Sequence, residues 1–172
     1  MIALYAGIGK VSWLIQKWHR GPFSHVSEID DDAAWEVESW FPRGVTMLSP
    51  FVNHQPGTPV HLYHLKKPLT TGESDGLKAF YASQVGKPYD LRGVLGFISR
   101  RDNAGRGQNR WFCGELIHAA YIHVKRPLLN PRHLPPHKAY PSILAYSTEI
   151  QLDRIAIVPA GQAGGRWQPR PI

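Results

Sequence analysis

The chain has 172 residues, of which 42% are hydrophobic and 19% are charged, and its formal net charge at pH 7 is +7. This composition is typical of a folded globular protein and excludes a disordered one. The single cysteine excludes an internal disulfide, and no apolar run approaches the roughly 20 residues of a membrane-spanning helix.

The first half of the chain predicts short strands and one helix. Residues 2–6 read as a strand, and apolar residues then recur at helical spacing at Val11, Leu14, Ile15 and Trp18. Alternating or β-branched runs between turn residues predict further strands at 24–29, 34–40, 45–48 and 59–65. Because the first two of these flank three consecutive aspartates, we expect them to form a hairpin.

The second half is richer in predicted helix. A helix is predicted to follow a cap at Thr71 or Ser74 and to stop at Gly86. An apolar segment at 91–98, a loop at 99–110, a helix at 113–124, a short helix at 142–148 and a strand at 152–158 follow. We therefore expect one α+β domain over residues 1–160 and a loose Gly- and Pro-rich tail at 161–172.

The N-terminus has neither a basic region before its apolar stretch nor a small-residue cleavage site, so no secretory signal is predicted. The cytoplasm is the default location, with no transmembrane anchor. The positive charge favours an anionic partner, but the basic residues are scattered and no zinc-finger or RRM motif is present. A solvated basic surface is thus preferred to a specific nucleic-acid interface.

The single cysteine, Cys113, stands where an irregular Gly- and Arg-rich run gives way to an apolar-periodic helix. It shares one stripe of that helix with Leu116, Ile117 and Ala120, so the thiol faces the body of the protein. The unpaired N–H groups of a helix start can stabilise a thiolate and hold an oxyanion. The alternative is that Cys113 is a small buried hydrophobic residue.

A cysteine nucleophile needs a base, and nine histidines are available. His118 lies five positions further along the helix and is rotated away from the thiol. His61 and His64 are three positions apart on a strand and face opposite sides, so they form no metal pair. With no second cysteine and no HExxH motif, no metal site and no cofactor are expected.

His25 differs because it lies in the first strand of the predicted hairpin. The second strand carries Glu36 and Glu38 on a single face, so either acid can orient the imidazole. The alternative is a structural strand histidine.

Four elements in order resemble circularly permuted, NlpC-type papain-like cysteine hydrolases, in particular the YiiX-like group and more distantly the lecithin retinol acyltransferases. They are Ser24-His25-Val26, Glu38 before Gly44-Val45, the run Gly86-Lys87-Pro88-Tyr89-Asp90, and Phe112-Cys113-Gly114-Glu115. The resemblance covers residues 1 to about 125 and implies an antiparallel sheet packed against the helix that carries the cysteine.

The resemblance implies that Cys113 is the nucleophile, His25 the base and Glu38 the acid that orients it, with Glu36 the less favoured alternative. Tyr89 matches a tyrosine beside the active site that can help bind an oxyanion, or it is a turn aromatic packed on the core. Arg110 ends an unusually basic loop, RRDNAGRGQNR, that can admit an acidic substrate or be simply solvated. The usual serine after the cysteine is replaced by glycine here.

The function implied is a thiol hydrolase, an amidase, peptidase or acyl-ester hydrolase that works through an acyl-enzyme without a cofactor. Its substrate would be a small peptide, an acyl amide or a lipid-like molecule. A peptidoglycan fragment would require delivery by a phage particle or by lysis, because no export signal is present. The alternative is a basic, non-catalytic binding module of the same fold that recognises an anionic partner.

Overall fold

The computed structural model describes residues 1–30, 32, 34–91, 93, 94 and 109–160. Most of the apolar segment expected at 91–98, most of the loop expected at 99–110 and the tail expected at 161–172 lie outside the described residues. Among the described residues, no helix is long and apolar enough to cross a membrane.

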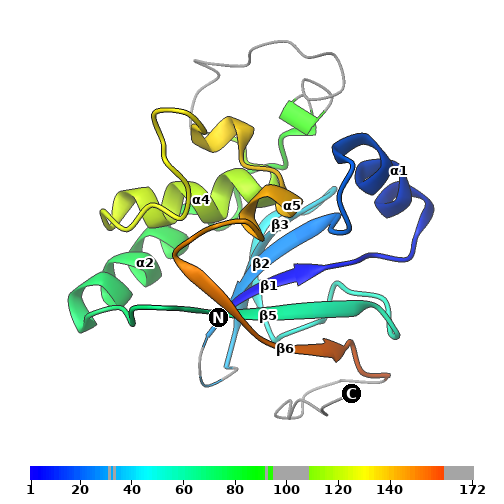
Figure 1. Cartoon of the computed structure of the whole chain (residues 1–172), viewed down its shortest axis with the longest axis horizontal. Helices are drawn as coiled ribbons and strands as arrows, with labels where there is room; N and C mark the ends of the chain where they lie inside the picture. Colours follow the sequence, from blue (N-terminus) through cyan, green and yellow to red (C-terminus); the bar gives the residue numbers. More distant parts are fainter. Residues whose placement is uncertain (31, 33, 92, 95–108, 161–172) are drawn as a thin grey trace.

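The fold is α+β, as predicted, and is built on a six-stranded antiparallel sheet (Figure 1). The strand order is β4-β3-β2-β1-β5-β6. The strands are β1 (Ile2–Tyr5), β2 (His25–Ile29), β3 (Glu36–Trp40), β4 (Gly44–Leu48), β5 (Pro59–Leu65) and β6 (Ile150–Ile157). The N-terminal strand β1 pairs with β2 on one side and β5 on the other, so the start of the chain is central in the sheet.

The predicted hairpin is confirmed as β2 and β3, which pair antiparallel with Ile29 opposite Glu36. Strand β4 then pairs with β3, with Glu38 opposite Thr46. Because side chains alternate along a strand, Glu36 and Glu38 share one face, as the sequence predicted. Gly44 begins β4 with a positive φ of 79°, and a Cβ there would lie 2.1 Å from the Lys87 carbonyl oxygen. This position therefore needs glycine.

The helices are α1 (Lys10–His19), α2 (Thr71–Gln84), α4 (Cys113–His123) and the short α5 (Pro141–Leu144), with a 3₁₀ turn at Pro136–Lys138. The cap of α2 is Thr70, one residue before the predicted Thr71. The Thr70 hydroxyl accepts from the Glu73 N–H at 3.3 Å, and the Glu73 carboxylate accepts from the Thr70 N–H at 2.7 Å. A capping box needs the acid three residues after the cap, and only Thr70 satisfies that spacing here.

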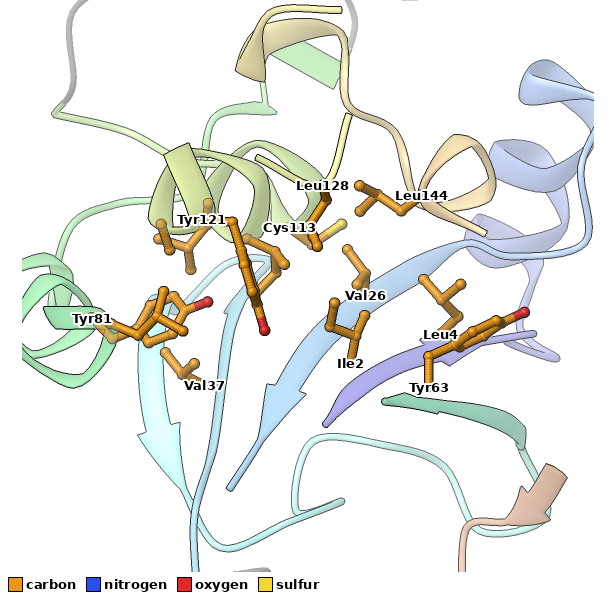
Figure 2. Packing of buried hydrophobic residues seen from close by; sticks show 14 of the residues in the cluster. Ile2, Leu4, Val26, Val37, Tyr63, Tyr81, Cys113, Tyr121, Leu128 and Leu144 are labelled. Atoms are coloured by element: carbon orange, nitrogen blue, oxygen red, sulfur yellow. The ribbon is translucent and has the colours of Figure 1, made fainter. Parts of the chain in front are cut away.

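Two apolar clusters occupy the two faces of the sheet. On one face, α4 packs over β2 and β3 and against α2 (Figure 1). Alternate strand residues such as Ile2, Leu4 and Val26 lie in this layer (Figure 2) and share one apolar cluster with Leu116 and Ile117. The intervening strand residues face the other way, into a smaller cluster that contains Ala3, Tyr5, Ile29, Phe51 and Leu62. The face to which each strand residue points thus follows from the two-residue period of the strand.

Candidate active site

His25 is the first residue of β2 and is buried with the carboxylate of Glu38. Its Nε2 lies 2.6 Å from Glu38 Oε2. The other carboxylate oxygen, Oε1, accepts from Asn53 Nδ2 at 2.7 Å, and Arg43 Nη1 donates to Asn53 Oδ1 at 2.6 Å. The Glu38 carboxylate is therefore fixed at both oxygens and presents one of them to the imidazole.

The second neighbour of the imidazole is Cys113. Burial disfavours protonation of the His25 ring, but the charge and hydrogen bond of Cys113, followed by the hydrogen bond and charge of Glu38, outweigh it. Together they raise the pKa of His25 to about 10. The imidazole thus interacts with both a carboxylate and the thiol.

The charges of the neighbouring histidines lower the pKa of the Glu38 carboxyl. Burial alone would raise the pKa of this carboxyl, but the hydrogen bond of His25 and the charges of His25 and His54 outweigh it and hold the pKa well below its usual range. The ionised carboxylate can therefore stabilise an imidazolium at His25.

Cys113 lies at the first position of α4, buried between that helix and the sheet (Figure 2). The residues before it are anchored to β3 and α2, because Ser39 Oγ donates to the Trp111 carbonyl at 2.6 Å and Trp111 Nε1 donates to Gln84 Oε1 at 3.0 Å. The N–H groups of the first helical turn have no partner within the helix and carry the positive end of its dipole. Such N–H groups can hold a developing oxyanion.

Gly114, the departure from the serine that the resemblance implies, has a local cause. A Cβ at this position would lie 1.7 Å from the Ala139 carbonyl oxygen. Glycine therefore permits the chain before α5 to approach the start of α4.

Glu36 has different partners from Glu38. Its two oxygens accept from the Tyr5 hydroxyl at 2.5 Å and from the Phe51 N–H at 2.6 Å. Its contacts tie β3 to β1 and to the loop after β4, whereas the hydrogen bond of the His25 ring goes to Glu38. The structure thus separates the two acids that the sequence left as alternatives.

His54 was missed by the sequence analysis. Its ring stacks on Tyr5 with centroids 3.6 Å apart, and its Nε2 lies 3.3 Å from Glu36 Oε1 and 3.2 Å from Glu38 Oε2. Neither contact has the geometry of a hydrogen bond, so this buried nitrogen is electrostatically paired but not hydrogen-bonded. The two carboxylates raise the pKa of His54 against the effect of burial. His54 lies in a turn-rich loop, where no periodic pattern of apolar residues predicts that a side chain is buried.

Tyr89, which the resemblance places beside the active site, packs as a turn aromatic against Trp111 and Phe41. It forms a β-bridge with Trp111, and its ring meets Phe41 edge-on at 5.9 Å. Burial, then the charges of Cys113 and Asp90, raise its pKa above the usual range, so its hydroxyl keeps its proton and can donate. Arg110 is exposed, directly before Trp111, and the basic loop up to residue 108 lies outside the described residues.

The other histidines considered lie apart from this cluster. A ring nitrogen of His118, Nε2, is 3.1 Å from the Leu134 carbonyl oxygen. His61 meets Phe23 edge-on, whereas His64 lies 3.6 Å from Asp153. The expectation that these two strand histidines do not act as a pair agrees with their different partners.

Three side chains of the cluster can nevertheless hold a metal ion. His25, Glu38 and His54 each offer one ligand atom, and these atoms all lie within 4.8 Å of one another. They come from β2, β3 and the loop after β4, so no short sequence motif marks them.

The fold and site define a class: an α+β protein in which a helix-borne cysteine meets a strand-borne histidine and its carboxylate. No family model matches the sequence, and no curated protein matches it. Among solved structures, the chain is similar to one described as metalloprotein yiiX from Escherichia coli O157:H7, DUF1105. The TM-score is 0.61 at 14% identity, over 88% of this chain and 93% of the other. The YiiX-like fold is thereby confirmed, whereas the NlpC-type relation, the circular permutation and the relation to lecithin retinol acyltransferases stay predictions.

Proposed function

We propose that the protein is a cysteine hydrolase that acts on an amide or ester carbonyl through an acyl-enzyme. The observation that supports this proposal is the interaction of the buried His25 ring with both Glu38 and Cys113. A base hydrogen-bonded to an orienting acid, beside a thiol on a helix start, is the arrangement that activates a cysteine nucleophile.

In the first half of the reaction, the Cys113 sulfur forms a bond to the carbonyl carbon. The carbonyl oxygen takes the negative charge and is held by N–H groups of the first turn of α4, with Tyr89 as a further donor. The imidazolium of His25 gives its proton to the leaving nitrogen or oxygen as the bond to the carbonyl carbon breaks. An amine or alcohol departs, and a thioester remains on Cys113.

In the second half, the neutral imidazole takes a proton from water, and the resulting hydroxide oxygen attacks the thioester carbon. The carbon–sulfur bond breaks, the acid product leaves, and the thiolate and imidazolium are restored. Glu38 holds the imidazole and stabilises its charged form throughout.

The direct test is to trap the acyl-enzyme. The full-length protein is incubated with activated esters, acyl amides, phospholipids and peptidoglycan fragments, and its intact mass is measured after rapid acid quenching. We expect a mass increase equal to the acyl group, located on Cys113 and missing from Cys113→Ala. Turnover that persists in Cys113→Ala, or no adduct with any of these substrates, would contradict the proposal.

A second candidate function is binding of a transition-metal ion by His25, Glu38 and His54. The two imidazoles and one carboxylate suit zinc and related ions. The buried His54 Nε2 has no hydrogen bond, and coordination of a metal ion would give this nitrogen a partner. The similar Escherichia coli structure is described as a metalloprotein. A bound ion would supply Lewis acidity at these residues, and it would also occupy the His25 nitrogen that Glu38 holds.

Cobalt(II) titration of the purified protein distinguishes the two candidates, because its visible absorption reports the ligands directly. Metal binding predicts a stoichiometric spectrum that His54→Gln weakens at least about tenfold in affinity. Absence of a saturable spectrum would exclude the metal function and leave the hydrolase proposal standing.

A further inference from the structure

Helix α1 presents most of its apolar residues outward, away from the body of the protein, and only Ile15 among them is half-buried. Val11, Leu14 and Trp18, which share one face of the helix, are 72%, 49% and 46% exposed. The neighbouring Ile8 and Trp13 are exposed as well, and no residue of the helix is buried. The sequence predicted this helix and its apolar stripe, but a surface helix normally turns such a stripe toward the core.

Polar contacts fix this orientation. Gln16 Nε2 donates to the Gly7 carbonyl at 3.1 Å, and the His19 ring stacks on Tyr140 with centroids 4.5 Å apart. Ser12, on the same side of the helix as Gln16 and His19, is also partly buried. The polar side of α1 therefore faces the protein, and its apolar side is exposed to solvent. An apolar patch of this kind marks an interaction surface.

The charge around the patch is positive. Lys10, Lys17 and Arg20 border it, and the first acidic residue of the chain is Glu28. Lys17 Nζ lies 4.8 Å from the centre of the Trp13 ring. Beside the helix, a groove of about 720 Å³ is lined by aromatic rings, including Trp18 and Tyr140, and by the cations Lys17 and Arg20.

We propose that α1 docks on the surface of an anionic lipid bilayer. Val11, Leu14 and Trp18 insert among the lipids, while Lys10, Lys17 and Arg20 meet phosphate groups. An apolar face with tryptophan, bordered by lysine and arginine and without acidic residues, is the pattern of helices that lie in the interface of anionic membranes. This inference concerns residues of α1, none of which belongs to the candidate active site, and it does not depend on catalysis.

The charges argue against a second copy of the chain as the occupant. In a two-fold contact, the same patch of both copies would meet, so the cations of one α1 would face those of the other. Helix α1 carries no carboxylate to neutralise them. Phospholipid headgroups supply the opposite charge.

The test is co-sedimentation of the full-length protein with vesicles of phosphatidylcholine alone or mixed equally with phosphatidylglycerol. We expect binding to the mixed vesicles that weakens with added salt and is much weaker on phosphatidylcholine. Leu14→Gln and Lys17→Glu should each lower the partition coefficient about tenfold or more. Tyr146→Ser serves as the matched control, because Tyr146 is 80% exposed outside α1, and it should bind like the wild type.

Thermal unfolding verifies that each variant is folded. We expect all of them to fold, because the substituted side chains are exposed. No binding to the mixed vesicles would overturn the proposal, as would equal binding to both kinds of vesicle. Equal loss in Tyr146→Ser would also overturn it. A dimer in light scattering that Leu14→Gln abolishes, in a protein that does not bind vesicles, would assign the patch to a second copy instead.

Discussion

At the scale of single residues, Glu36 and Glu38 show how two acids on one strand face acquire different tasks. Glu38 faces the His25 ring, whereas Glu36 accepts from Tyr5 and from the Phe51 N–H. Both are almost fully buried, so each depends on its partners to offset the loss of hydration. Substitution by glutamine keeps the shape of each side chain and removes its charge.

Glu38→Gln should lower the acylation rate by about 10²-fold or more, because an orienting carboxylate holds the productive tautomer and stabilises the imidazolium. Substrate binding should stay nearly unchanged. Single-turnover acylation with an activated ester that Cys113 accepts measures both quantities separately.

Glu36→Gln is the matched control. It should leave most of the acylation rate but lower the free energy of unfolding by about 1–3 kcal/mol, since one amide oxygen cannot replace two carboxylate acceptors. If Glu36→Gln is the variant that loses acylation, the proposed role of Glu38 is wrong. If neither variant loses it, another group orients the imidazole.

Glu115, two residues after the cysteine, gives the fold a pH dependence. Burial, then the charge of Asp90, raise the pKa of this carboxyl to about 7, against a hydrogen bond from the Phe112 backbone. The folded state therefore retains a proton that the unfolded chain releases near pH 4.5, and stability is lost as pH rises from about 4.5 to 7.

Glu115→Gln should remove this loss. The free energy of unfolding of the variant minus that of the wild type should therefore increase between pH 4.5 and pH 8, by on the order of 2–3 kcal/mol. Urea unfolding of both proteins at the two pH values measures it. A stability difference that does not change with pH would show that Glu115 titrates normally.

At the scale of elements, the junction of α4 with the chain before α5 depends on Gly114. Gly114→Ser should lower the free energy of unfolding by about 1–3 kcal/mol, because the new Cβ would collide with the Ala139 carbonyl. Gly72→Ser is the matched control, since a Cβ at that helical position meets nothing within 4 Å. Denaturant unfolding of the two variants compares them. Equal stability would mean that the junction relaxes without cost.

Local patterns account for the elements that the sequence predicted. The alternation in β2 and β3 gave the hairpin and the shared face of Glu36 and Glu38, because a strand has a two-residue period. The helical spacing predicted α1 but not its outward-facing apolar side, since that depends on the contact of Gln16 with the preceding turn and of His19 with the distant Tyr140. His54 escaped for a similar reason: its burial comes from tertiary packing on Tyr5.

At the scale of the whole molecule, the site joins segments that are distant in the sequence. His25 comes from the second strand and Cys113 from a helix in the last third of the chain. Cys113 is the first residue of α4, which packs over β2 and β3, and Ser39 anchors the residue that precedes this helix by two positions. The spacing of His25 and Cys113 in the sequence does not predict that they interact. That expectation came from the family resemblance.

The central claim is that Cys113 works with His25 as an activated thiol, and the rate of its alkylation tests this most directly. Iodoacetamide rates are measured from pH 5 to 9 on the wild type and on His25→Asn, with the alkylated residue confirmed by mass. We predict that the wild-type rate reaches a plateau below neutral pH and that His25→Asn loses the plateau. A wild-type rate that simply rises with a midpoint near pH 8.5, as for an isolated thiol, would contradict the claim.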